Sequence, residues 1–147
     1  MTRQAPDFTL PSTDGEITLS KLDGKVVLYF YPRDDTPGCT LEALDFDRLA
    51  AEFAAAGTKV IGISRDTLAS HQKFCTKHGL GITLASDTGA VTEAYGVWVE
   101  KTLYGKKSMG IERSTFLIDA DGRILQEWRK VKVAGHAEAV LTAAQAQ

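Results

Sequence analysis

The sequence has few cysteines and lacks a long hydrophobic run, and both absences exclude classes of protein. Two cysteines, Cys39 and Cys75, occur among 147 residues, too few for the disulfide scaffold of a small secreted domain. The longest strongly apolar run, VVLYFY at residues 26–31, is far shorter than the roughly 20 residues that a membrane-spanning helix needs. The first 15 residues hold no apolar segment of signal-peptide length. We therefore expect a cytoplasmic protein without a membrane contact.

The sequence also lacks an excess of charge of either sign. It has 17 basic and 19 acidic residues, and the formal net charge is −2. No basic stretch points to nucleic acid, and no acidic tail points to a basic partner. The length predicts one domain over residues 1–147, large enough to bury a core without metals or disulfides.

Alternating strand and helix patterns predict an α/β fold. Short extended segments joined by STDG predict an N-terminal β-hairpin, and VVLYFY predicts a strand buried on both faces. Together the patterns predict a mixed central sheet flanked by helices on both faces. Residues 101–110 are expected to form a loop. The other expected strands are 58–64, 82–86, 114–119 and 123–132, with a hairpin turn at 120–122, and the expected helices are 39–56, 67–78, 87–95 and 135–147.

The stretch YPRDDTPGCTLEA, residues 31–43, places Cys39 close to two acidic residues. Nearby negative charge disfavours a thiolate. Thr36 is a good N-cap and Pro37 suits the first helical position, so Cys39 falls in the first turn of a helix. Unpaired amides and the helix dipole make that position favourable for a thiolate. We expect Asp34 and Asp35 to point to solvent, where their charge is screened.

The spacing P-x-x-x-T-x-x-C, formed by Pro32, Thr36 and Cys39, resembles the peroxidatic signature of the peroxiredoxins, thiol peroxidases with a thioredoxin-like fold. The string TPGCTLEA is similar to the subgroup called bacterioferritin comigratory protein or peroxiredoxin Q. The resemblance covers nearly the whole chain in order, through APDFTLPSTDGEITLSKLDGKVVLYFYP, SRDTLASHQKF, LASD, YGVW and GIERSTFLIDADG.

The resemblance implies a role for each matching residue. Cys39 corresponds to the thiolate that attacks a hydroperoxide, and Arg113 to the cation beside it. Thr36 and the amides near Gly38 would donate hydrogen bonds to the peroxide oxygens, and Pro32 would shield the thiolate. The chemistry implied needs no metal, flavin or haem.

The resemblance also implies how the oxidised cysteine is restored. Many members of the subgroup carry a resolving cysteine five residues after the peroxidatic one, where this chain has Leu44. Other members carry it on the next helix, where Cys75 matches. This implies a Cys39–Cys75 disulfide, a thioredoxin-like reductant and a monomer. If Cys75 is inert, the chain is a one-cysteine peroxidase that uses an external thiol.

Three other interpretations compete with this one. His71, Cys75 and His78 have a spacing that can share a helix face and bind zinc, although no fourth ligand is evident. The sequence D-T-G at residues 87–89 matches a short aspartic protease signature, but Asp87 as a helix cap explains it better. A dithiol oxidoreductase or redox sensor of the same fold normally carries C-x-x-C, which this chain lacks.

Overall fold

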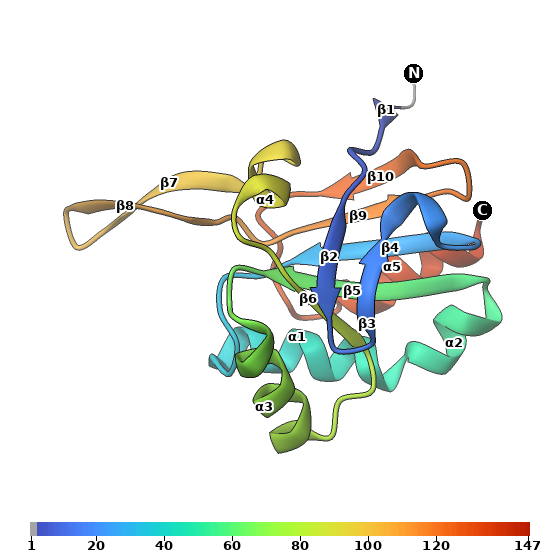
Figure 1. Cartoon of the computed structure of the whole chain (residues 1–147), viewed down its shortest axis with the longest axis horizontal. Helices are drawn as coiled ribbons and strands as arrows, with labels where there is room; N and C mark the ends of the chain where they lie inside the picture. The colour runs from blue at the N-terminus through green and yellow to red at the C-terminus, as the bar shows by residue number, and fades with distance from the viewer. Residues whose placement is uncertain (1–2) are drawn as a thin grey trace.

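The computed structural model describes residues 3–147, in which eight strands form one mixed sheet with helices packed against it (Figure 1). The strands are β1 (Arg3–Gln4), β2 (Thr9–Ser12), β3 (Gly15–Thr18), β4 (Lys25–Phe30), β5 (Thr58–Ser64), β6 (Thr83–Ser86), β7 (Trp98–Leu103), β8 (Lys106–Ile111), β9 (Ser114–Ile118) and β10 (Arg123–Trp128). The helices are α1 (Pro37–Arg48), α2 (Ala50–Ala55), α3 (Leu68–His78), α4 (Ala90–Ala94) and α5 (His136–Gln145), with a 3-10 turn η1 (Leu19–Lys21). The strand order is β1-β10-β9-β4-β5-β6-β2-β3, and β7 pairs with β8 separately.

β4 lies at the centre of the sheet and is buried on both faces, as its apolar run predicts. Leu28 and Phe30 belong to a core shared with the β2–β3 hairpin and α4. Val27 and Tyr29 belong to a second core beneath α1, α2, α3 and α5. Successive strand residues point to opposite faces, and each large apolar side chain that is fully buried contributes about 1.5–3 kcal/mol. The predicted sheet with helices on both faces and an N-terminal hairpin is confirmed.

The carboxyl end of β4 and the beginning of β9 meet at one edge of the sheet. β4 is parallel to β5 and antiparallel to β9, with Phe30 paired to Ser114. The loop of residues 31–36 leaves β4 at this edge, and Arg113 immediately precedes β9. Chain topology therefore brings the start of α1 close to a residue more than half the chain away.

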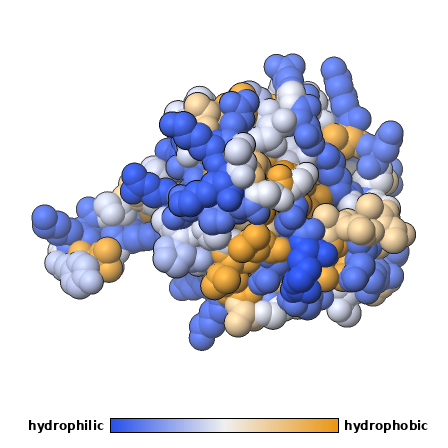
Figure 2. Space-filling view, turned by 90° about the horizontal axis from the view of Figure 1, so that it is seen from below, coloured by the Kyte–Doolittle hydropathy of each residue, from blue (hydrophilic) through white to orange (hydrophobic). Residues whose placement is uncertain are grey.

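The prediction that residues 101–110 form a loop is wrong. They belong to an antiparallel hairpin of β7 and β8, which projects from the body of the protein (Figure 1). Tyr104 and Gly105 form its turn with φ values of 52° and 77°, as a two-residue type I′ turn requires. Figure 2 shows mainly hydrophilic atoms along this hairpin, so no apolar alternation in the sequence indicated its strands.

The helix predicted as one piece over residues 39–56 is divided at Leu49 into α1 and α2. Leu49 has φ −96° and ψ 3°, which departs from helical geometry at that residue. Within residues 3–147, no helix has the length and apolar composition to cross a membrane.

Gly62→Ala should destabilise the centre of the sheet. A Cβ on Gly62 would lie 2.6 Å from Tyr29 Cζ and 2.8 Å from Leu84 Cδ2. Overpacking a core typically costs about 1–3 kcal/mol, and we expect the free energy of unfolding in urea to fall by that amount. Gly81→Ala is the matched control, because its Cβ would meet Asp47 Oδ1 at an ordinary 3.6 Å. Equal losses in the two variants would contradict the packing argument.

Candidate active site

Cys39 lies in the first turn of α1 and is buried, with 1% of its surface exposed. Thr36 is the N-cap and Pro37 the first helical residue, as predicted. Amides of a first helical turn lack partners within the helix, and the dipole makes that end positive. The position of Cys39 therefore favours negative charge on its sulfur.

Arg113 approaches Cys39 from the beginning of β9. Its Nη2 donates to Cys39 Sγ at 3.4 Å, and its Nη1 donates to Glu42 Oε1 at 2.6 Å. The Arg113 side chain is 17% exposed, so water screens this charge only partly. A cation at this distance stabilises a thiolate relative to a thiol.

Glu42 is a residue of the site that the sequence-based interpretation missed. It lies one helical turn after Cys39 on the same face of α1, and its side chain is 1% exposed. Oε1 pairs with Arg113, whereas Oε2 has no hydrogen-bond partner within residues 3–147. Burial raises the pKa of Glu42 to about 7, although the Arg113 charge opposes this. The available signal was a carboxylate three residues after the cysteine on a face that is otherwise apolar.

Gly38, Thr36 and Pro32 are the other residues near Cys39 to which the resemblance gave a role. A Cβ on Gly38 would lie 3.3 Å from Arg113 Nη2, so this glycine leaves room for the guanidinium. Thr36 Oγ1 donates to the Arg33 carbonyl at 2.9 Å, and Pro32, the second residue after β4, is exposed. The expected contacts of Thr36 and Pro32 with a peroxide stay predictions.

The expectation that the two aspartates point to solvent is wrong for Asp34. Its side chain is 4% exposed, accepts a hydrogen bond from the Tyr31 hydroxyl at 2.5 Å and contacts His71 Nδ1 at 2.7 Å. Burial raises its pKa, but hydrogen bonds with His71 and Tyr31 outweigh this and hold the pKa of Asp34 below its usual value. Asp35 is 42% exposed and pairs with Lys77 and His78 of α3. Partners on α3, rather than water, compensate the negative charge near Cys39.

Cys75 lies on α3 as a free, partly buried thiol. The zinc site considered for this helix is not assembled around it: both ring nitrogens of His71 contact oxygen atoms, at 2.7 and 2.9 Å, and His78 pairs with Asp35. In the described part of the chain, one group of side chains could hold a metal ion, because its potential ligand atoms lie within 4.8 Å of one another. These atoms already take part in hydrogen bonds. That group consists of Asp34, Asp66 and His71.

The N-cap of α4 is Gly89, not Asp87, but Asp87 of the D-T-G sequence binds the first turn of this helix from three residues before it. Its carboxylate accepts hydrogen bonds from the backbone amides of Val91 and Thr92, at 3.2 and 2.8 Å. The side chain is buried and thereby satisfies amides that the helix itself cannot pair. This geometry gives Asp87 the role of a cap, although not its position, and leaves the protease interpretation without support.

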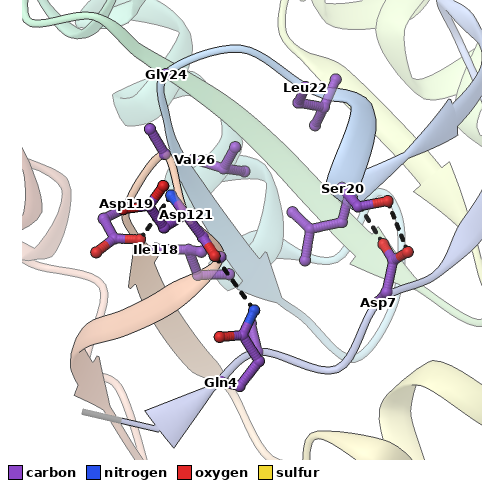
Figure 3. A pocket seen from close by; sticks show the side chains of 13 residues that line it. Gln4, Asp7, Ser20, Leu22, Gly24, Val26, Ile118, Asp119 and Asp121 are labelled. Carbon is purple, nitrogen blue, oxygen red and sulfur yellow. Dashed lines mark hydrogen bonds between the residues drawn. The ribbon is translucent and has the colours of Figure 1, made fainter.

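Figure 3 shows a pocket of about 120 Å³ lined by Gly24 and Val26 at the start of β4. Cys39 instead follows the end of that strand. The pocket is enclosed by the N-terminal segment, η1 and the turn between β9 and β10. Its polar groups pair with one another: the Ser20 hydroxyl donates to Asp7, and the Gln4 amide donates to the Asp121 carbonyl. The pocket is therefore distinct from the cysteine site.

Comparison with known proteins places these features in a family. Residues 1–127 match the AhpC/TSA family. Peroxiredoxin Bcp of Xanthomonas campestris is 55% identical over 122 residues, which are 82% of this chain and 76% of that protein. Peroxiredoxin Bcp of Bacillus subtilis is 50% identical over 144 residues, 95% and 92% of the two chains. A solved structure of X. campestris peroxiredoxin Q superposes with a TM-score of 0.90 at 50% identity, covering 95% of this chain and 90% of that one.

The chain belongs to the AhpC/TSA family and, within it, to the peroxiredoxins of the Bcp and peroxiredoxin Q group. It is a thiol-dependent peroxidase with a thioredoxin-like fold, as the resemblance implied.

The pKa of Glu42 gives a prediction about stability. Between pH 4.5 and about 7 the folded protein holds a proton that an unfolded Glu42 releases, so this residue's contribution to the free energy of unfolding falls as pH rises through that window. The advantage of wild type over Glu42→Gln should therefore shrink by up to about 3 kcal/mol across it. Urea unfolding of the reduced proteins at several pH values measures this. If the difference in the free energy of unfolding between wild type and Glu42→Gln does not change with pH, Arg113 keeps Glu42 ionised throughout this pH window.

Gly38→Ala should slow the oxidation of Cys39. The added Cβ would lie 3.3 Å from Arg113 Nη2, a tight approach that we expect to shift the guanidinium slightly and to lengthen its contact with Cys39. Misplacing a charge-stabilising group by a small distance costs about tenfold or more in rate. Stopped-flow oxidation with hydrogen peroxide measures the second-order rate constant, and Gly81→Ala again serves as control. Oxidation of the Gly38 variant at the wild-type rate would contradict the close approach of residue 38 to Arg113.

Proposed function

We propose that Cys39 is the peroxidatic residue of this enzyme and that Arg113 stabilises both its thiolate and the reacting peroxide. The 3.4 Å contact between Arg113 Nη2 and Cys39 Sγ carries this proposal. It joins a thiol at the start of a helix to a fixed positive charge, the two conditions that make a cysteine reactive. Glu42 holds the other nitrogen of the guanidinium and thus fixes its direction.

In the first step the Cys39 thiolate attacks the terminal oxygen of a hydroperoxide. An S–O bond forms and the O–O bond breaks; the sulfur is oxidised to a sulfenic acid, and the alkoxide or hydroxide that leaves takes up a proton. Negative charge moves from sulfur to the leaving oxygen during this step. Donors that are already in place stabilise that charge most effectively, and Arg113 and the amide of Cys39 would act so. The Thr36 hydroxyl, which donates to the Arg33 carbonyl in this structure, would have to turn toward the peroxide first.

In the second step the Cys75 sulfur attacks the sulfenic sulfur. An S–S bond forms, the S–O bond breaks, and water leaves. The position of Cys75 on α3, partly packed against the same core as Cys39, supports this assignment. Two solved variants of X. campestris peroxiredoxin Q each carry serine in place of one cysteine, and the replaced positions are as far apart in the chain as Cys39 and Cys75.

A thioredoxin-like dithiol protein then reduces the disulfide and restores both thiols. A solved structure of the X. campestris bacterioferritin comigratory protein, 49% identical with a TM-score of 0.89, concerns its alkyl peroxide reduction activity. This supports alkyl hydroperoxides, together with hydrogen peroxide, as substrates here. The monomeric state, the cytoplasmic location and the single domain stay predictions from the sequence.

Cys75→Ser should permit one rapid oxidation of Cys39 and then stop turnover with a dithiol protein reductant. Mass spectrometry after one equivalent of hydrogen peroxide should show a sulfenic acid on Cys39 in the variant and a Cys39–Cys75 disulfide in wild type. Cys39→Ser should show neither product and serves as the control.

Sustained turnover of the Cys75 variant at the wild-type rate would remove Cys75 from the cycle and indicate a one-cysteine peroxidase. Oxidation of Cys39 no faster than that of free cysteine would instead favour a disulfide exchanger or redox sensor over a peroxidase.

A further inference from the structure

The loop of residues 31–36 is attached to α3 through its two aspartates. Asp34 Oδ2 contacts His71 Nδ1 at 2.7 Å and accepts a hydrogen bond from Ser70 Oγ at 2.8 Å. Asp35 contacts the last turn of the same helix at 2.7 and 2.9 Å, through Lys77 and His78. We call these six residues the aspartate clamp. It holds α3 at both ends, with Cys75 between them, and it attaches the loop that leads directly into the first turn of α1.

The two halves of the aspartate clamp differ in burial. The His71 side chain is 0% exposed and that of Asp34 is 4% exposed, whereas Asp35 is 42% exposed. Exposed ion pairs contribute little because water and salt screen them. Loss of one partner from a buried pair leaves an uncompensated polar group, which is strongly unfavourable. The pair of Asp34 and His71 is therefore the half that holds the loop in place.

Hydrogen-bond geometry shows that a proton lies between Asp34 and His71. The backbone carbonyl of Ala85 can only accept, so the His71 Nε2 that contacts it at 2.9 Å donates. The Tyr31 hydroxyl donates its single proton to Asp34 Oδ1 at 2.5 Å. The remaining 2.7 Å contact between Nδ1 and Oδ2 thus needs a proton of its own. The polar side-chain atoms of Asp34 and His71 all have hydrogen-bond partners only while the loop of residues 31–36 lies on α3.

Disulfide formation requires a movement of the Cys39 or the Cys75 sulfur away from its present contacts. Cys39 Sγ is held by Arg113, and Cys39 is 1% exposed. A disulfide brings two sulfurs to about 2.05 Å and their Cα atoms within about 7 Å. Both cysteines are free thiols in this structure, so at least one thiol must leave its present position. The aspartate clamp links the elements that carry them.

We propose that Asp34 and His71 are positioning residues whose separation limits the rate at which the Cys39–Cys75 disulfide forms. This inference rests on the proposed resolving role of Cys75. The closed clamp holds the loop of residues 31–36 on α3 and leaves the contact of Arg113 with Cys39 untouched, so the reaction with peroxide does not depend on it. The open clamp frees the loop and α3 for the second step.

The state of Cys75 fits this assignment. Burial, followed by the carboxylate of Asp34 and more distant acidic groups, raises the pKa of the Cys75 thiol. In the closed arrangement Cys75 is thus a protonated, weak nucleophile. Opening would expose Cys75 to water and move Asp34 away, and both changes favour its thiolate.

The test separates the two chemical steps in Asp34→Ala, with Asp35→Ala as the matched control from the exposed half. After mixing reduced full-length enzyme with hydrogen peroxide, stopped-flow measures the first oxidation, and acid quench with mass spectrometry measures the disulfide. We expect Asp34→Ala to form the disulfide at least about tenfold faster, with the first oxidation within about twofold of wild type. Asp35→Ala should change the disulfide rate by less than about threefold. Ser70→Ala, which removes one donor to Asp34, should shift the disulfide rate in the same direction and serves if Asp34→Ala does not fold.

A disulfide rate that is unchanged or slower in both Asp34→Ala and Ser70→Ala would overturn the inference alone. A wild-type enzyme that never forms the Cys39–Cys75 disulfide would overturn the proposed resolving step and, with it, this inference. Hydrogen exchange of the reduced enzyme gives an independent readout: amides of residues 33–36 and of α3 should exchange faster in Asp34→Ala than in Asp35→Ala. Equal exchange in the two variants would contradict the role of the buried pair.

Discussion

The buried contact of Arg113 with both Cys39 and Glu42 is the interaction on which the site depends. Removing a guanidinium and a carboxylate from water costs several kcal/mol for each ion, and only close pairing offsets this. The Nη1–Oε1 distance of 2.6 Å supplies that pairing. The contact is possible because β9 lies antiparallel to β4 and begins opposite its last residue. The order of the strands and the position at which α1 starts therefore together bring the charged groups of the site into contact.

Glu42 has a second consequence for the sulfur. A fully ionised Glu42 would cancel most of the Arg113 charge and leave little to stabilise a thiolate. Burial raises the pKa of Glu42 to about 7, so near neutral pH part of the population carries a protonated Glu42. The guanidinium keeps its orientation through the hydrogen bond, while part of its charge remains for Cys39.

The sequence predicts the sheet and the start of α1 because both follow from local patterns: a continuous apolar run, and the Thr-Pro pair before Cys39. The position of Arg113 came from family resemblance, since nothing local distinguishes it from a surface arginine. Glu42 and Asp34 were misjudged because their partners lie on β9 and α3, far away in the chain. The β7–β8 hairpin was missed because an exposed strand pair has no core to impose apolar alternation.

The two aspartates before Cys39 first suggested a penalty on its thiolate, and the structure shows that their charge is directed elsewhere. Asp34 is satisfied by α3, so it acts on the chemistry of Cys39 only through the loop that it fixes. Two sets of contacts thus hold the same first turn: Arg113 attaches it to the sheet edge, and Asp34 attaches its loop to α3. In the proposed cycle, attack on peroxide needs the first contact, whereas formation of the disulfide requires release of the second. Because different residues make these contacts, substitutions can change the rate of one step without changing that of the other.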